Sequence, residues 1–325
     1  MRRTEAKVYV DFNEDDERYL PEGPRWVTIE GRPALVWVNI QLDATADEGE
    51  VNVHFPDTDG SDDCGIGCHG RPGFLLPVDE PDRALVGVDK ELVLVDLAEG
   101  VWSDALAHIH DDEPRTIIND GEVVPGGKAV VFGTKDTQFD VNAKLAKLYL
   151  YTTDDNRVSV LADKQVCSNG KVFATDARGL ILYDIDTPTR KVVRYRLDVV
   201  ARTATPDGTA LDLSNEPGFP DGMCDCGDGT VIVAFYNPEP VEAGRAVRYD
   251  LATGAAVEEW TTHGSPRVTC PLLVKRPGGV KLFLTTAMEG MTPAQHAQCP
   301  NAGCIFVADT TLADCPAPEL VRLGE

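Results

Sequence analysis

Four oxygen-bearing side chains stand beside glycines at a regular pitch along this chain. Asn119, Asn169 and Asp221 follow one another at intervals of 50 and 52 residues, and Glu22 precedes Asn119 by 97. The longer interval is close to twice either of the others. A chain that repeats about every 50 residues and offers one carboxylate or amide oxygen per repeat can point those oxygens at a common centre. The pattern is typical of a radial repeat fold with a metal site on its axis.

The local sequence signal is mostly that of β-strands. Short runs rich in β-branched residues are bounded by Gly, Asp or Pro, for example at 34–40, 84–88, 92–95, 129–132 and 231–235. One short helix is predicted around 292–298. Two further turns, at 68–73 and 265–271, continue the pitch. The sequence therefore predicts an all-β, six-bladed β-propeller with four-stranded antiparallel blades around a central axis that carries a metal site. We expect one domain over 1–325, with residues 1–20 as an N-terminal extension or a closing strand.

Composition excludes several classes of function. The chain has 30 basic and 54 acidic residues, a net charge of −24, which argues against nucleic-acid binding. No apolar run approaches the roughly 18 residues of a membrane span. The first 20 residues contain no apolar segment typical of a secretory signal, so we expect a cytoplasmic protein. Nine cysteines, an odd number, are then expected as reduced thiols. Nothing implies an oligomeric partner.

The four marker residues suit a hard cation. Glu22, Asn119, Asn169 and Asp221 supply two carboxylates and two amides, the oxygen ligands that Ca²⁺ and Mg²⁺ prefer. We interpret the adjacent glycines as tight turns from which each side chain projects off a strand end. The alternative for any one of these motifs is an ordinary hairpin turn.

The residues around the markers form an ordered series of motifs. These are E-G-P-x-W at 22–26, N-D-G with a later F-G-T within 119–134, S-N-G at 168–170, P-D-G-M-C at 220–224, and L-F-L-T-T-A at 282–287. The series resembles the senescence-marker-protein/gluconolactonase/luciferin-regenerating-enzyme-like (regucalcin-like) family over most of 18–310. The resemblance implies a six-bladed propeller with an axial divalent metal that hydrolyses lactones, and in some members phosphotriesters. It implies Glu22, Asn169 and Asp221 as metal ligands, Asp221 as the catalytic general base, and Asn119 as a ligand or substrate contact.

The chain departs from that family around the expected pocket. Ile117 stands where sugar-lactone hydrolases of this kind carry Arg, and an acidic substrate contact is replaced within 135–138, which includes Gln138. Cys270 stands near a position where relatives often have Asn or Cys. We expect Asn119, Ile117, Gln138 and Cys270 to contact the substrate. Since the pocket should be less polar, the departures favour another lactone or ester over a sugar polyol.

Our main hypothesis is a metal-dependent lactone or ester hydrolase that uses one divalent cation, with Ca²⁺ preferred and Mg²⁺, Mn²⁺ or Zn²⁺ as alternatives. A phosphotriesterase and a non-catalytic Ca²⁺-binding or ligand-binding propeller remain as alternatives. The partner is a small lactone or ester, with no membrane or nucleic acid. We interpret the His108–His110 pair as a solvated loop, Cys64, Cys68 and His69 as the pocket rim, and Cys224 and Cys226 as blade packing. No G-x-S-x-G elbow or phosphate-binding loop is present.

Overall fold

The computed structural model describes residues 1–12, 18–58, 60–110 and 112–324. Almost all of its regular structure is β-strand, as the sequence predicts. The expected short helix is confirmed as α1 (Pro293–Gln298), where Thr292 and Gln295 form a capping box, and a short 3-10 turn, η2, spans Thr187–Thr189. Within these described residues no helix has the length and apolar character needed to span a bilayer.

Four of the sheets are built from consecutive strands, each running outward from an innermost strand. The first contains β2 (Pro21–Ile29), β3 (Arg32–Asn39), β4 (Glu50–His54) and β5 (Cys64–Gly67). The second contains β6 (Pro72–Pro77), β7 (Arg83–Val88), β8 (Glu91–Asp96), β9 (Val101–Trp102) and β10 (Ala107–His108). The third contains β11 (Thr116–Val123), β12 (Ala129–Asp136), β13 (Ala146–Thr152) and β14 (Arg157–Gln165). The fourth contains β15 (Ser168–Asp176), β16 (Gly179–Asp186), β17 (Lys191–Asp198) and β18 (Thr203–Asp212).

The last sheet has eight strands because the N-terminal strand joins two consecutive runs. One run is β19 (Phe219–Asp225), β20 (Thr230–Tyr236), β21 (Ala243–Asp250) and β22 (Ala256–His263); the other is β23 (Val268–Arg276), β24 (Gly279–Thr286) and β25 (Ile305–Asp309). The first half of β1 (Arg2–Val10) pairs parallel to β22, and its second half pairs antiparallel to β25. The N-terminal strand thereby ties the end of the chain back to its beginning.

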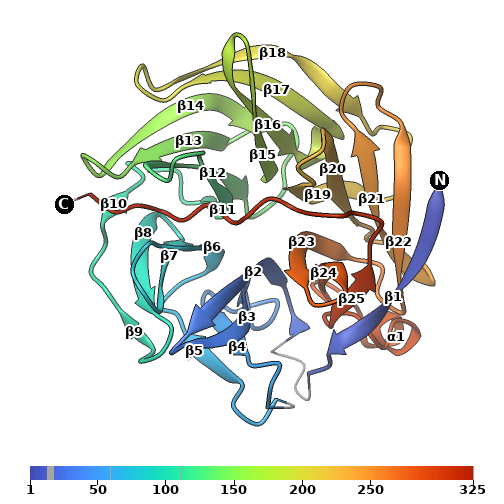
Figure 1. The fold of residues 1–325 in the computed structure, drawn as a ribbon. Helices are drawn as coiled ribbons and strands as arrows, with labels where there is room; N and C mark the ends of the chain where they lie inside the picture. The colour runs from blue at the N-terminus through green and yellow to red at the C-terminus, as the bar shows by residue number, and fades with distance from the viewer. Residues whose placement is uncertain (13–17, 59, 111, 325) are drawn as a thin grey trace.

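The sheets stand around a common axis (Figure 1). The innermost strands β2, β6, β11, β15, β19 and β23 contact one another in turn, and β23 contacts β2, so the described strands form a closed ring. Hydrophobic cores fill the space between neighbouring sheets; Trp37 and Trp260 are fully buried there, as expected for blade core. This radial arrangement of sheets is the propeller-type fold that the repeat predicts.

Every innermost strand is irregular near its beginning. The register against its hairpin partner shifts at Glu22/Arg25, Pro72/Phe74, Ile118/Gly121, Asn169/Lys171, Pro220/Met223 and Val268/Pro271. The interpretation of the marker glycines as tight turns at strand ends is therefore wrong: the markers lie inside strands, at bulges that redirect side chains. Gly170 shows why glycine is needed, because a Cβ there would lie 2.5 Å from Cβ of Met223 on the neighbouring strand.

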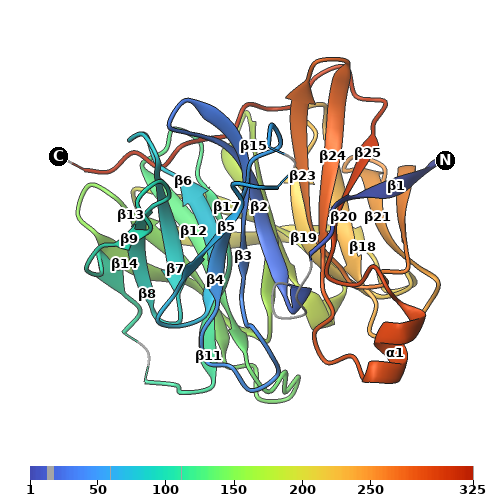
Figure 2. The same ribbon diagram turned by 90° about the horizontal axis from the view of Figure 1, so that it is seen from below.

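One end of the ring is crossed by the last residues of the chain, which we call the C-terminal strap (residues 316–324). Figures 1 and 2 show this segment passing over the sheets from the β25 side toward β10. The backbone N–H of Val321 donates to the carbonyl of Pro77 at 2.9 Å, and that of Arg322 donates to the carbonyl of Gly127 at 2.8 Å. Pro77 and Gly127 lie where innermost strands end. The strap therefore covers the end of the ring opposite to the bulged strand starts.

Candidate functional site

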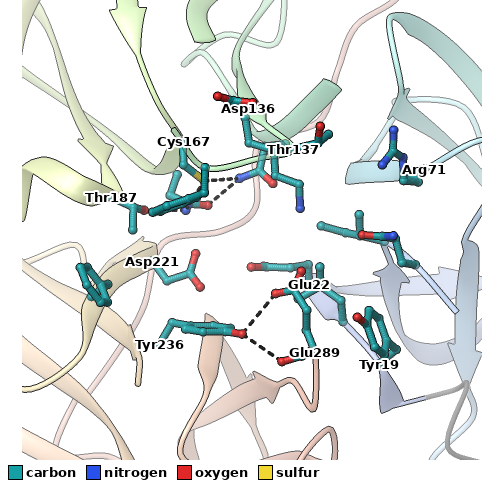
Figure 3. A pocket seen from close by; sticks show the side chains of 18 of the residues that line it. Tyr19, Glu22, Arg71, Asp136, Thr137, Cys167, Thr187, Asp221, Tyr236 and Glu289 are labelled. Atoms are coloured by element: carbon teal, nitrogen blue, oxygen red, sulfur yellow. Dashed lines mark hydrogen bonds between the residues drawn. The ribbon is translucent and has the colours of Figure 1, made fainter. Parts of the chain in front are cut away.

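A cavity of about 660 Å³ opens at the end of the ring where the innermost strands begin. The bulges bring all four marker residues to its wall: Glu22 from β2, Asn119 from β11, Asn169 from β15 and Asp221 from β19. Figure 3 shows Glu22 and Asp221 reaching the same part of this pocket from different sheets. Residues that span 200 positions of sequence thus share one wall because the ring closes.

The two amides are held in place by a chain of hydrogen bonds across four elements, β11, β15, η2 and β19. Asn119 Nδ2 donates to Asn169 Oδ1 at 2.8 Å, and Asn169 Nδ2 donates to Thr187 Oγ1 at 2.7 Å. The Thr187 hydroxyl then donates to the carbonyl of Pro220 at 2.9 Å, beside Asp221. Because both amide nitrogens donate to protein acceptors, the orientation of each amide is fixed. The Asn169 oxygen accepts the hydrogen bond from Asn119 and keeps its second lone pair free for a ligand.

The backbone of Asn169 is anchored by a buried amine. Lys171 Nζ donates to the Asn169 carbonyl at 2.7 Å and to Ser168 Oγ at 3.1 Å, and lies 3.6 Å from the Asp184 carboxylate. Burial raises the pKa of Asp184 to about 6, although Lys171 opposes that shift. The Lys171–Asp184 pair therefore supports the bulge that presents Asn169 without itself reaching the cavity wall.

The two carboxylates have no ion-pair partner among the described residues. Among the described residues, no cationic group lies within 4 Å of either Glu22 or Asp221. Burial, followed by the charge of Asp120, raises the pKa of Glu22 to about 8. Burial, followed by the charge of Glu22, raises the pKa of Asp221 well above its usual range. A half-buried and a buried carboxylate whose pKa values are both raised in this way form a site that would gain free energy from a cation.

Three expected substrate contacts do not line the cavity. Ile117 is buried in β11 and faces Lys135 across the β11–β12 pair. Gln138 is exposed, and its backbone N–H donates to Asp136 Oδ1. Cys270 is buried in β23 beside β19: its Cα lies 2.8 Å from the position that a Cβ on Gly222 would take. Only Asn119 of that predicted group stands on the cavity wall.

Other polar residues complete the wall. Lys135, Arg71, Tyr236 and Glu289 all line the cavity. Tyr236 donates its hydroxyl to Glu289 Oε2 at 3.2 Å, as Figure 3 shows, and the Arg267 guanidinium lies 5.5 Å from the centre of the Tyr236 ring. The replacement of an acidic substrate contact within 135–138 is visible in the sequence, but it does not by itself place Lys135 in the pocket. Glu289 had no sequence signal, because it follows β24 outside every motif.

The ligand types at this site restrict what it can bind. In the part of the chain that the structure describes, no group of three or more His, Cys, Asp or Glu side chains is arranged to hold a metal. A cation at the ring axis would have to use amide oxygens beside Glu22 and Asp221, which is a donor set for a hard ion.

A closed ring of sheets with carboxylates and amides gathered at one end of its axis defines a class of propeller-type protein with an axial small-molecule site. A sequence model of the SMP-30/Gluconolactonase/LRE-like region matches residues 20–288. The chain belongs to this family.

Three relatives illustrate the similarity. Regucalcin of Xenopus laevis is 27% identical over 212 residues, which cover 63% of this chain and 67% of the frog protein. YvrE of Bacillus subtilis, provisionally named a sugar lactone lactonase, is 27% identical over 305 residues, covering 90% of this chain and 92% of that protein. The crystal structure of a calcium-binding protein, regucalcin from Agrobacterium tumefaciens, has a TM-score of 0.79 at 23% identity and covers 99% of this chain and 100% of that one. The matched part spans about two thirds of the frog regucalcin, and the lactonase-named relative supports an enzyme that acts on lactones.

Proposed function

We propose that this protein is a divalent-metal-dependent lactone hydrolase, with Glu22, Asn169 and Asp221 as the metal ligands. The observation that carries the proposal is the pair of carboxylates on the cavity wall, half-buried Glu22 and buried Asp221, which have no cationic partner within ion-pair distance among the described residues. The lactonase name of the Bacillus subtilis relative supports the reaction class.

The residues present fit a hard divalent ion. Two carboxylates would balance its charge, and the Asn169 oxygen would add a neutral ligand whose orientation the Thr187 hydrogen bond already fixes. We propose Ca²⁺ as the first candidate, in keeping with the calcium-binding Agrobacterium relative, with Mg²⁺, Mn²⁺ and Zn²⁺ as alternatives. We also propose that residues 1–325 form one six-bladed propeller, in which the eight-stranded sheet counts as two blades joined by β1.

The chemistry follows from the site's own groups. A bound divalent cation would polarise the lactone carbonyl and acidify water at the same place. Asp221 would accept the proton from the attacking water, since its carboxylate stands on the cavity wall without an ion-pair partner. Asn119 would orient the substrate through its amide oxygen, because its nitrogen is held by Ser168 and Asn169. The cavity is large enough for a monocyclic lactone.

The deciding experiment measures hydrolysis of lactone, ester and phosphotriester panels by the purified protein after chelation and after return of each metal. We expect lactone turnover that chelation abolishes and one divalent ion restores. Metal-dependent turnover of phosphotriesters alone would replace the lactonase proposal with the phosphotriesterase. Tight Ca²⁺ binding without turnover of any panel would instead support the binding protein that the calcium-binding relative suggests.

A further inference from the structure

Lys135 is a positively charged side chain on the cavity wall that has no role in the proposed chemistry. It lies near the end of β12, lines the cavity, and its charge lowers the pKa of both Glu22 and Asp221. Within the described residues no carboxylate lies within 4 Å of its Nζ, and no hydrogen bond from that amine was found. An amine that lines a polar cavity without a fixed partner is free to bind a ligand.

A second cation stands on the same side of the ring. Arg71 directly precedes β6, the innermost strand of the second sheet, which contacts β11 in the ring. It lines the cavity together with Lys135. Figure 3 shows Arg71 on the side of the pocket formed by the β6 sheet. Only its Nε is engaged in an ion pair within the described parts of the chain, at 3.4 Å from Asp89, so its terminal nitrogens can serve a planar anion.

Glu289, one of several carboxylates on the wall, comes from the sheet opposite that of Lys135. Glu289 follows β24, whose sheet begins with β23, three places from β11 around the ring. It accepts a hydrogen bond from Tyr236. The cavity wall therefore carries Lys135 and Arg71 on one side, beside an Asp136 carboxylate that is paired with Arg115. Its other side carries Glu289, which accepts hydrogen bonds from hydroxyl groups.

The charges at the site indicate that Lys135 does more than neutralise the carboxylates of Glu22 and Asp221. One divalent cation would balance Glu22 and Asp221, and Lys135 would then remain beside the charges of Asp120 and Glu289, neither of which lies within 4 Å of its amine among the described residues. The protein as a whole carries a net charge of −24, which disfavours the approach of an anion. Among the described residues, a cavity-lining amine without an ion-pair partner is therefore a specific feature of the pocket in so acidic a protein.

We propose that the substrate is a lactone with an anionic oxygen group, a carboxylate or a phosphate monoester, which Lys135 binds with the help of Arg71. The proposal rests on the proposed lactonase function and names its substrate class. Lys135 acts here as a specificity residue. The anion would hold the lactone ring with its hydroxyl substituents toward Glu289.

The test compares three versions of one γ-lactone: with a ring carboxylate, with a phosphate monoester, and with an uncharged carboxamide in the same position. We expect the wild-type protein, loaded with its metal, to have a kcat/KM at least 10-fold higher for one of the charged lactones than for the carboxamide. The charged lactone that wins identifies the anion. A wild-type preference for the carboxamide would overturn the proposal.

Lys135→Met then isolates the amine. We expect it to lower kcat/KM for the charged lactone by about 10- to 100-fold, mainly through KM, and to leave the carboxamide within threefold. Lys135→Arg should recover part of the loss. Lys7→Met, which removes an equally positive but exposed residue of β1, is the matched control and should change neither substrate. An equal loss on all three lactones would show that Lys135 only balances the carboxylates, and would overturn the proposal.

Failure of the lactonase itself gives a different result. If no lactone is turned over with any metal, calorimetric binding of the carboxylate-bearing lactone to the wild type and to Lys135→Met still decides the inference. Binding that is at least 10-fold tighter to the wild type supports an anion-binding pocket in a non-catalytic protein. Equal binding to both proteins overturns it.

Discussion

The two ends of the ring axis are built in opposite ways. At the cavity end, bulged strand starts present Glu22 and Asp221, whose carboxylates have no compensating cation within 4 Å among the described residues. At the other end, hydrogen bonds between the C-terminal strap and the ring pair backbone N–H groups with carbonyl groups. Val321 of the strap is completely buried. Asp79 and Pro77 hold Val321 from both sides in a parallel bridge register with Val78.

The difference separates the stability of the ring from its chemistry. Satisfied backbone hydrogen bonds and buried apolar surface stabilise the strap end. Unpaired buried carboxylates destabilise the cavity end until a cation binds there. The same innermost strands thus have one end suited to closure and one end suited to ligands, and changes at the two ends should affect different measurements.

The largest expected effect comes from Asp221→Asn at the cavity end. Asparagine cannot accept the water proton and contributes no charge to the metal site, so we expect kcat to fall by roughly 10³-fold or more. The chelated variant should be at least as stable as the chelated wild type, because the substitution removes a buried carboxyl group that is costly to ionise. Steady-state kinetics and thermal unfolding check both parts. Full turnover by a correctly folded variant would contradict the assignment.

The second prediction concerns the pH dependence of the metal-free protein. The folded-state pKa of Glu22 is raised from 4.5 to about 8, and that of Asp221 is raised as well. Between pH 4.5 and about pH 8 the folded state holds protons on these carboxyl groups that the unfolded state has lost. The free energy of unfolding therefore falls as pH rises. We expect a loss on the order of 3 kcal/mol between pH 5 and pH 8, measured by urea unfolding in chelator.

Metal and mutation provide the controls for that pH dependence. A saturating divalent cation should flatten the slope, since it keeps both carboxylates ionised in the folded state. The double variant Glu22→Gln with Asp221→Asn should flatten it in chelator too, which separates the site from the general repulsion of a chain with net charge −24. A slope that survives in the double variant would assign the effect to the surface.

Much of the fold could be predicted because its signals are local. Glycine-bounded, β-branched runs specify strands, and the regular pitch specifies repetition around an axis. The N-terminal strand could not be predicted in detail, because its parallel pairing with β22 joins Arg2 to Glu258 and its antiparallel pairing with β25 joins Lys7 to Val307, near opposite ends of the chain. The marker glycines were misinterpreted as turns for a related reason: what they allow is contact with a neighbouring strand, which only the closed ring reveals.

The site divides in the same way. Glu22, Asn119, Asn169 and Asp221 could be placed together from sequence because each lies at the same point of its own repeat. Lys135 and Glu289 come from second strands or the connections after them, so no repeat position marks them. Ile117 was expected in the pocket because it stands where sugar-lactone hydrolases of the family carry Arg, but alternation along β11 and the bulge after Ile118 leave it buried beside Lys135 instead.

At the strap end, removal of residues from Pro316 onward should destabilise the ring without changing its chemistry. Burial of Val321 and the hydrogen bonds to Pro77, Asp79 and Gly127 together account for an expected loss of about 2 to 3 kcal/mol. Urea unfolding in saturating metal measures that loss. Metal affinity and KM should stay within twofold of the full chain, and a larger change in either would show that the two ends are coupled.

The smallest effect is also the sharpest test of the strap contact, because the chain offers two adjacent glycines in the β11–β12 turn. Gly126 and Gly127 both have positive φ, 96° and 80°, so alanine is strained at either position. A Cβ on Gly126 would meet nothing within 4 Å, whereas one on Gly127 would lie 2.4 Å from the carbonyl oxygen of Leu320 in the strap.

Gly126→Ala therefore measures the backbone strain alone, and Gly127→Ala measures that strain plus displacement of the strap. We expect Gly127→Ala to lower the free energy of unfolding by about 1 kcal/mol more than Gly126→Ala does. The difference cannot exceed the cost of truncation, since the strap can detach rather than remain in a clash. In the truncated chain the two substitutions should become equal. A difference that persists without the strap would mean that Gly127 is required by its own turn, and that the strap stabilises the ring only through Val321.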